Sequence, residues 1–189
     1  VKQPRADEVA VGFLGFGNLA KAAAQALRLL GFQLNGWSRR PAAMDGVRCF
    51  AGEAGLAPFL AATDILVVLL PLTPRTQGIV NYSLLKELRR RNGLGGAVLI
   101  NAGRGRLQKD ADILRALEDG TLKEASLDVF EVEPLPKTSR LWGHPKIFIT
   151  PHSAATSDPA HLAPIMLRQM DAYERGEALE NLVDLKAGY

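Results

Sequence analysis

Short, almost uninterrupted apolar runs recur along the chain and alternate with segments whose apolar residues are spaced three and four apart. The runs are typical of strands buried on both faces, and the three-and-four spacing is typical of amphipathic helices. The pattern predicts strands over residues 9–14, 32–37, 47–50, 65–70, 97–100, 125–129 and 147–150. It predicts helices between residues 15 and 31, over 56–62, 83–91 and 109–118, and a last long helix starting near 158–159.

This alternation of strands and helices predicts an α/β fold. Strands that follow helices in turn form a parallel sheet covered on both faces, and right-handed crossovers make a doubly wound sheet the simplest topology. In the first helix we expect the buried face to carry Leu19, Ala23, Ala26, Leu27 and Leu30. The last helix has Ser157 or Asp158 as its expected cap, followed by a proline that suits a first turn.

A glycine-rich loop joins the first strand to the first helix, and residues 15–20 read GFGNLA. Gly15 permits the tight turn, Gly17 lets the backbone approach a pyrophosphate closely, and Ala20 is small enough for the helix to lie against the strand. The N–H groups of the first helical turn, around Asn18 and Leu19, would then face that anion. Between a strand and a helix, the motif indicates a Rossmann-type dinucleotide-binding domain rather than a purely structural turn.

The end of the second strand favours NADP as the cofactor. An NAD site has an acidic residue there, which binds the hydroxyls of the adenosine ribose. This chain has Ser38, Arg39 and Arg40 instead, with no carboxylate before Asp45. Guanidinium groups bind phosphate oxygens in a fork, so this turn suits the 2′-phosphate of NADP. NAD remains possible, and two solvated arginines in a surface loop are the alternative interpretation.

Composition and cysteine content limit the class of protein and the cellular compartment that we expect. The 189 residues are 47% hydrophobic and 23% charged, as in an ordinary globular protein. The longest apolar run, residues 65–72, is far short of the roughly 20 residues that span a membrane. Cys49 is the only cysteine, which excludes an internal disulfide and a cysteine zinc site. Without a secretory leader we expect a cytoplasmic protein with no metal and no membrane contact.

The charge pattern gives little support for nucleic-acid binding. The net charge is only +3, and the one basic run is 89–91. Leu84, Leu85 and Leu88 precede it at helical spacing, so we interpret the run as the solvated end of an amphipathic helix. No aromatic residues interleave with these cations, and we therefore expect no nucleic-acid partner.

Several further segments resemble the D-isomer-specific 2-hydroxyacid dehydrogenase family. They are residues 69–74 (LLPLTP), 78–81 (GIVN), 100–105 (INAGRG), 127–136 (LDVFEVEPLP) and 150–155 (TPHSAA). Trp142, His144-Pro145 and the final Ala-Gly-Tyr resemble the glyoxylate and hydroxypyruvate reductases of that family. The resemblance runs in register over nearly the whole chain. It implies an NAD(P)-dependent reductase of small 2-keto acids that acts as a homodimer.

The resemblance also implies roles for three catalytic residues, and their chemistry suits those roles. Arg104 offers a permanent planar cation for the substrate carboxylate. His152 is the expected proton donor, because an imidazole titrates near neutral pH. Glu133 would hydrogen-bond the imidazole and favour its charged form. The remaining cofactor contacts implied by the resemblance are Leu70, Pro71, Thr76, Asn101, Ala102, Gly103 and Asp128, the last at the nicotinamide amide.

The resemblance also implies an architecture of two domains with a cleft between them. One domain binds the cofactor, and the other covers the substrate. The first Rossmann strand here begins by residue 9, and residues 156–189 are too few to build the second domain. We therefore expect a dinucleotide-binding domain over residues 1–155, and a C-terminal helix and tail over 156–189 that pack on a substrate domain absent from this chain.

On this interpretation the chain is the cofactor-binding portion of a longer reductase and is inactive alone. The alternative is a non-catalytic NAD(P)-binding or redox-sensing module. The presence of Arg104, Glu133 and His152 together favours the enzyme.

Overall fold

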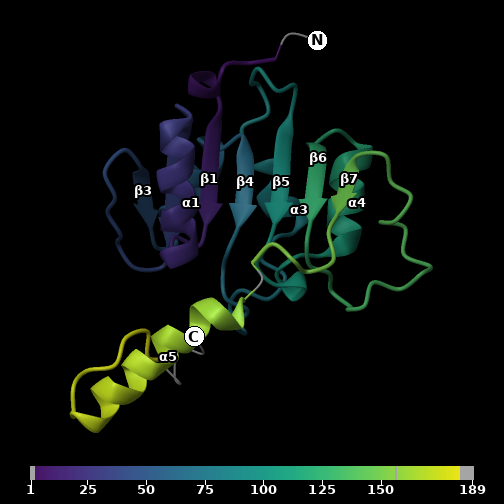
Figure 1. Ribbon diagram of the computed structural model, residues 1–189. Coiled ribbons are helices and arrows are strands. Elements are labelled where there is room, and N and C mark those ends of the chain that lie inside the picture. Colours follow the sequence, from purple (N-terminus) through teal and green to yellow (C-terminus); the bar gives the residue numbers. More distant parts are fainter. Residues whose placement is uncertain (1–2, 156, 184–189) are drawn as a thin grey trace. The chain divides into compact units, whose positions relative to one another are not determined.

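Seven apolar segments pair as parallel strands in one sheet of this computed structural model, which describes residues 3–155 and 157–183 (Figure 1). The strands are β1 (Ala10–Leu14), β2 (Gln33–Ser38), β3 (Arg48–Ala51), β4 (Ile65–Val68), β5 (Ala97–Asn101), β6 (Leu122–Leu127) and β7 (Ile147–Ile149). Their order across the sheet is β3-β2-β1-β4-β5-β6-β7. The chain therefore winds outward in both directions from β1 and β4, and the predicted doubly wound sheet is confirmed.

Helices cover both faces of this sheet. They are α1 (Asn18–Leu29), α2 (Leu56–Ala61), α3 (Tyr82–Lys86) and α4 (Asp110–Glu118), with short 3₁₀ turns η1 (Ala6–Glu8) and η2 (Gly105–Leu107). Successive residues of β1 serve different layers: Phe13 packs in the cluster that contains α1, and Leu14 in the cluster that contains α2, α3 and α4. This two-sided burial explains why the strands have apolar runs rather than alternating patterns.

The expected buried face of α1 was wrong in part. Ala20 and Ala24 are the fully buried residues of this helix, whereas Leu19 is 53% exposed and Leu30 is 65% exposed. Ala26 is exposed as well. Two alanines one turn apart let the helix lie close to the strands, and larger side chains would hold it away. Counting apolar residues favoured leucines, but the close approach selects small residues.

Helix α3 is shorter than predicted and ends at Lys86 rather than near residue 91. Leu84, Leu85 and Leu88 are buried as expected. The basic run that follows is not simply a solvated helix end, because Arg89 forms an ion pair with the buried Asp64. Burial of Leu88 carries the chain back toward the sheet and delivers Arg89 to that carboxylate.

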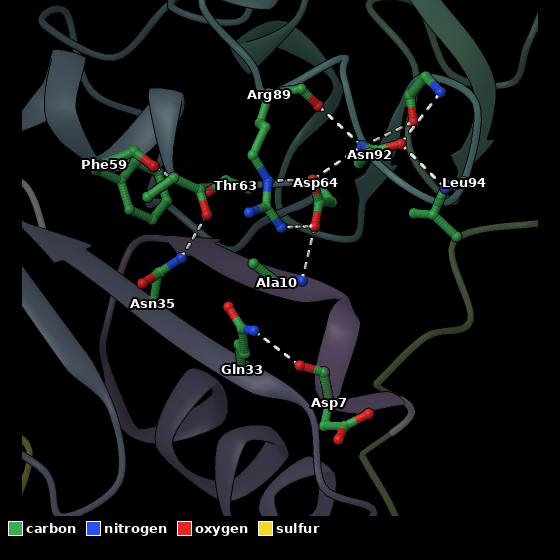
Figure 2. Close-up of polar contacts among 12 residues, drawn as sticks. Asp7, Ala10, Gln33, Asn35, Phe59, Thr63, Asp64, Arg89, Asn92 and Leu94 are labelled. Carbon is green, nitrogen blue, oxygen red and sulfur yellow. Dashed lines mark hydrogen bonds and ion pairs between the residues drawn. The ribbon is translucent and has the colours of Figure 1, made fainter. Parts of the chain in front are cut away.

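Asp64 is the centre of a hydrogen-bond network at the amino ends of β1, β4 and β5 (Figure 2). Its fully buried carboxylate accepts from the backbone N–H of Ala10 at 2.8 Å, from Nδ2 of Asn92 at 2.8 Å, and from Nε and Nη2 of Arg89. Burial alone would raise the pKa of Asp64, but the hydrogen bonds from Arg89, Ala10 and Asn92 outweigh it and hold that pKa below its ordinary value. The network fixes the starts of three central strands.

The described residues divide into two compact units, one ending at His152 and the other beginning at Ser153. The second unit contains α5 (Pro159–Glu174). Its cap is Asp158, whose carboxylate accepts from the backbone N–H of Ala160 at 2.9 Å, as the sequence predicted. Helix α5 buries none of its residues, and its exposed apolar side chains are Leu162, Ile165, Met166, Leu167, Met170 and Tyr173. Across residues 3–155 and 157–183, no helix has both the length and the apolar character to cross a membrane.

Candidate functional site

The residues predicted for the site follow the carboxyl ends of six strands. Because the strands are parallel, these ends lie along one edge of the sheet, where their arrowheads point in Figure 1. The predicted residues are Gly15, Gly17, Asn18 and Leu19 after β1; Ser38, Arg39 and Arg40 at the end of β2; Leu70, Pro71 and Thr76 after β4; Asn101, Ala102, Gly103 and Arg104 at the end of β5; Asp128 and Glu133 after β6; and His152 after β7. The strand order reverses between β1 and β4, where dinucleotides bind in sheets of this kind.

Glycine is needed at positions 15 and 17 of the loop for different physical reasons. Gly15 has φ +101°, and a Cβ atom there would lie 2.8 Å from backbone atoms of Leu69 and Leu70. Gly17 faces open space, with no atom within 4 Å of where its Cβ would be. Gly17 is also the cap residue of α1 and has no side chain to accept from the first turn. This open backbone at a helix start fits a pyrophosphate.

The turn after β2 carries its arginines on the surface. The hydroxyl of Ser38 donates to the backbone oxygen of Arg40 at 2.7 Å, which holds the turn. Arg39 and Arg40 are both exposed. Asp45, the first carboxylate after them, binds Nη1 of Arg28 at 2.7 Å. The turn thus offers cationic groups where an NAD site would have an acid, and it fits a phosphate better than a bare ribose.

The loop after β4 is closed by its own side chains. The hydroxyl of Thr76 donates to the backbone oxygen of Pro71 at 2.7 Å and accepts from the backbone N–H of Thr73 at 2.8 Å. Leu70 is only 9% exposed, and its backbone lies against Gly15. Thr76 therefore shapes the loop, and the loop begins with the backbone of Leu69 and Leu70 next to the glycine turn.

The loop after β5 begins at the buried Asn101 and carries the exposed side chain of Arg104. Asn101 is fully buried; its Nδ2 donates to Oε1 of Gln108 at 2.7 Å, and its Oδ1 accepts from the N–H of Gly103 at 3.0 Å. Ala102 donates its N–H to the backbone oxygen of Val68 at 3.3 Å. Arg104 is exposed, and the part of the chain that the structure describes gives it no ion-pair partner. Its Nη1 donates to the backbone oxygen of Gly103 at 2.7 Å, and the guanidinium has further N–H groups that can bind a carboxylate ligand.

Glu133 and His152 form a hydrogen-bonded pair, with Oε2 of Glu133 2.8 Å from Nδ1 of His152. Oε1 of Glu133 accepts from the backbone N–H of Phe130 at 2.9 Å. Partial burial would raise the pKa of Glu133, but the bonds from Phe130 and His152 and the charges of His152 and Arg104 hold that pKa below its ordinary value. An ionised carboxylate only accepts, so Nδ1 carries the proton in this bond.

Sequence reasoning missed Thr150, although the strand register points to it. Leu127 pairs with Ile149 across β6 and β7, so the next residues, Asp128 and Thr150, are also neighbours. The hydroxyl of Thr150 donates to Oδ1 of Asp128, and Asp128 is only 5% exposed. Thr150 thereby orients the carboxylate expected to contact the nicotinamide amide. The signal in the sequence is a hydroxyl residue directly after one strand and an aspartate directly after the neighbouring parallel strand. It identifies Thr150 once the pairing of β6 with β7 is known.

Comparisons with known proteins identify the family of this chain. Residues 2–154 match the family model described as D-isomer specific 2-hydroxyacid dehydrogenase, NAD binding domain. A curated relative, glyoxylate/hydroxypyruvate reductase A of Citrobacter koseri, is 44% identical over 183 residues, which cover 97% of this chain and 57% of the relative.

Two solved structures are similar throughout. The NADPH-dependent glyoxylate/hydroxypyruvate reductase of Sinorhizobium meliloti, in complex with NADP and sulfate, is 48% identical with a TM-score of 0.96, covering 100% of this chain and 60% of that chain. A probable 2-hydroxyacid dehydrogenase of Rhizobium etli, in complex with NADP, HEPES and L(+)-tartaric acid, is 48% identical with a TM-score of 0.95, covering 100% and 59%. The chain thus spans less than two thirds of the length of these relatives. It belongs to the D-isomer specific 2-hydroxyacid dehydrogenase family, and its residues 2–154 match the NAD-binding domain of that family.

Proposed function

We propose that the chain is the cofactor-binding portion of an NADPH-dependent reductase of small 2-keto acids, of the glyoxylate/hydroxypyruvate type. The observation that carries the proposal is the Glu133–His152 pair, which follows the same sheet edge as Arg104 and the glycine loop. The relatives from Citrobacter koseri and Sinorhizobium meliloti are named as reductases of this type, which supports the same activity here.

Each residue of the catalytic set has a role that its contacts support. The exposed fork of Arg104 binds the carboxylate of the keto acid and orients its carbonyl. Nε2 of His152 donates the proton that the carbonyl oxygen needs as it becomes a hydroxyl. Glu133 holds the imidazole through Nδ1 and stabilises its charged form. NADPH, when bound, supplies the hydride.

The preference for NADPH over NADH is also part of the proposal. It is supported by Arg39 and Arg40 at the end of β2, by the pairing of Asp45 with Arg28, and by the NADP found in the Sinorhizobium meliloti relative. Gly17 leaves the room that the pyrophosphate requires. Asp128 would bind the nicotinamide amide, with Thr150 fixing its carboxylate.

The domain organisation remains a proposal as well. We infer that residues 1–155 form the dinucleotide-binding domain and that residues 156–189 pack on a substrate-binding domain. The exposed apolar side chains of α5 support this, because apolar surface of that extent is stabilised by a partner. The greater length of the relatives supports it too. A homodimer in the cytoplasm completes the proposal, and light scattering after gel filtration tests the dimer.

The proposed activity is tested by following NADPH oxidation at 340 nm with glyoxylate or hydroxypyruvate and the full-length protein. NADPH binding is followed separately by fluorescence. Turnover with either keto acid is the expected result. Tight NADPH binding with no turnover on any small 2-keto acid would instead favour the non-catalytic or redox-sensing module. Residues 1–189 alone should bind NADPH but reduce glyoxylate at or below background, because hydride transfer requires exclusion of water and close positioning.

A further inference from the structure

Gln108 is a buried polar residue with no direct place in the proposed chemistry. It follows the turn η2 and is only 1% exposed. Its Oε1 accepts from Nδ2 of Asn101 at 2.7 Å, and its Nε2 donates to Oδ1 of Asp110 at 2.8 Å and to the backbone oxygen of Val129 at 3.2 Å. Both ends of the amide are therefore used, and within the described residues no buried side-chain nitrogen or oxygen lacks a partner.

These bonds join the loop of Arg104 to the loop of Glu133. On one side, Asn101 is the base of the arginine loop and holds the N–H of Gly103. On the other side, Val129 precedes Phe130, whose N–H fixes the Glu133 carboxylate. One side chain thus links the two segments whose separation sets the distance between the substrate-binding cation and the proton donor.

The two segments also contact each other directly, which restricts their relative movement. A Cβ atom on Gly105 would lie 1.7 Å from the backbone oxygen of Phe130. The backbone beside Arg104 is therefore seated on the backbone that carries Glu133. Loss of the Gln108 amide would leave the oxygen of Val129 without its buried partner, and Nδ2 of Asn101 with only its longer bond to the backbone oxygen of Arg104 at 3.4 Å. Such poorly satisfied groups are relieved by movement of the loop.

We propose that Gln108 is a positioning residue that fixes Arg104 relative to the Glu133–His152 pair, a role that rests on the proposed reductase function. Gln108 is buried and is not expected to touch substrate or cofactor. It acts through Asn101 on the arginine loop and through Val129 on the acidic loop. Its removal should therefore change how the keto acid is held and leave the NADPH contacts at Gly17 and Arg39–Arg40 intact.

The test uses the full-length protein with Gln108→Met, which keeps the length of the side chain and removes its amide. Asn35→Leu is the matched control, because Asn35 is also buried and bonds the backbone oxygen of Ala62 at 2.8 Å, beside the Asp64 network (Figure 2). We expect kcat/KM for glyoxylate to fall about 10- to 100-fold in Gln108→Met, since a small misplacement of a substrate-holding group costs that much. NADPH affinity should fall by a smaller factor than kcat/KM, because the contacts at Gly17 and Arg39–Arg40 are untouched and only those expected at Asn101–Gly103 lie on the disturbed loop. An unchanged kcat/KM, or an equal loss in Asn35→Leu, would overturn the proposal.

A double-mutant cycle separates positioning from general loosening. Arg104→Lys keeps the charge but loses the fork, so the orientation that Gln108 provides has less to act on. In the Arg104→Lys background, Gln108→Met should cost less than about threefold in kcat/KM. The same loss in both backgrounds would contradict action through Arg104. If Gln108→Met does not fold, Gln108→Glu keeps the acceptor for Asn101 and serves in its place.

Amide hydrogen exchange distinguishes failure of this proposal from failure of the proposed function. If the wild-type protein reduces no keto acid, the proposed function is refuted, whatever the result for the Gln108 variants. The amides of Gly103 and Phe130 report the two loops independently of catalysis, and both should exchange about 10-fold faster in Gln108→Met. The same amides should be unaffected in Asn35→Leu. Unchanged exchange in Gln108→Met would refute the positioning role even in an active enzyme.

Discussion

The backbone N–H of His152 donates to the backbone oxygen of Asp128 at 2.9 Å. This bond joins the loop that follows β7 to Asp128, the first residue after β6. His152 adopts φ +54°, in the left-handed region. Residues with a Cβ atom rarely adopt that conformation, and it persists only where the surroundings hold it. The imidazole is thereby placed against Glu133, so the backbone orients the proposed proton donor before any substrate arrives.

The left-handed backbone determines the best variant for testing His152. Asparagine tolerates that conformation better than most residues, so His152→Asn should keep the loop while removing the proton donor. In the full-length protein we expect keto acid reduction to fall about 10²- to 10⁴-fold, with NADPH affinity nearly unchanged. Steady-state rates at 340 nm and fluorescence titration measure the two quantities. Full activity in His152→Asn would move the proton donor elsewhere.

Glu133 should set the pH dependence of the reaction. Its pKa is held below the ordinary value, so its carboxylate is charged at neutral pH and can stabilise a charged imidazole there. Glu133→Gln removes that charge, and the fall of the reduction rate at alkaline pH should then begin at a lower pH. The profile of kcat/KM against pH measures it. An identical profile in the variant would show that Glu133 does not act on the imidazole.

The two glycines of the first loop should separate folding from binding. Gly15→Ala places a Cβ against the backbone of Leu69 and Leu70 at a positive φ, so the melting temperature should fall. Gly17→Ala adds its methyl group in open space and should leave the melting temperature within about 2 °C. The same methyl group would occupy the place proposed for the pyrophosphate, so NADPH binding should weaken strongly. Tight binding in Gly17→Ala would mean that the cofactor approaches elsewhere.

Much of this arrangement was predictable because it depends on local patterns. Apolar runs define the strands, and the glycine, arginine, acidic and histidine segments all follow strands that must be parallel. The buried face of α1 was not predictable by counting apolar residues, since the space between helix and sheet decides it. The glycine motif indicated Ala20, but Ala24 followed from no pattern in the sequence. Gln108 and Thr150 escaped for another reason. Their importance lies in partners from other strands, and single polar residues give no pattern until the register is known.

The arginine turn should control the choice of cofactor. Replacing Arg39 and Arg40 together by alanine should weaken NADPH binding about 10-fold or more, since each charge-assisted hydrogen bond contributes about 1.5–3 kcal/mol. NADH binding should change little. Arg140→Ala is a suitable control, because Arg140 is an exposed arginine that binds Glu118 far along the chain. Calorimetry that finds equal affinities for NADPH and NADH in the unmodified protein would refute the preference.

Asp64 should contribute stability that depends on pH. Its pKa in the folded state lies below that of an unfolded aspartate, about 3.9, so its contribution is present above that pH and is lost as the pH falls through the folded-state pKa. Asp64→Asn should cost toward the lower end of about 3–5 kcal/mol at pH 7, because the remaining Arg89 is 35% exposed and reaches water. Urea unfolding measures the difference.

The exposed pair Arg28–Asp45 provides the control for this measurement. Asp45 is 95% exposed, so Asp45→Asn should have a much smaller effect than Asp64→Asn at pH 7. The gap between Asp64→Asn and the unmodified protein should shrink in acid. A gap that stays constant down to the lowest pH at which the protein folds would show that Asp64 does not titrate as inferred.

The position of the Asp64 network has a consequence for engineering this fold. It joins the amino ends of β1, β4 and β5, whereas every loop of the candidate site leaves a carboxyl end. Combinatorial libraries that randomise the carboxyl-edge loops would leave the network untouched. Selection for new cofactor or substrate preferences can therefore start from an intact scaffold, and heat-resistant versions can be sought at the opposite end without altering the residues under selection.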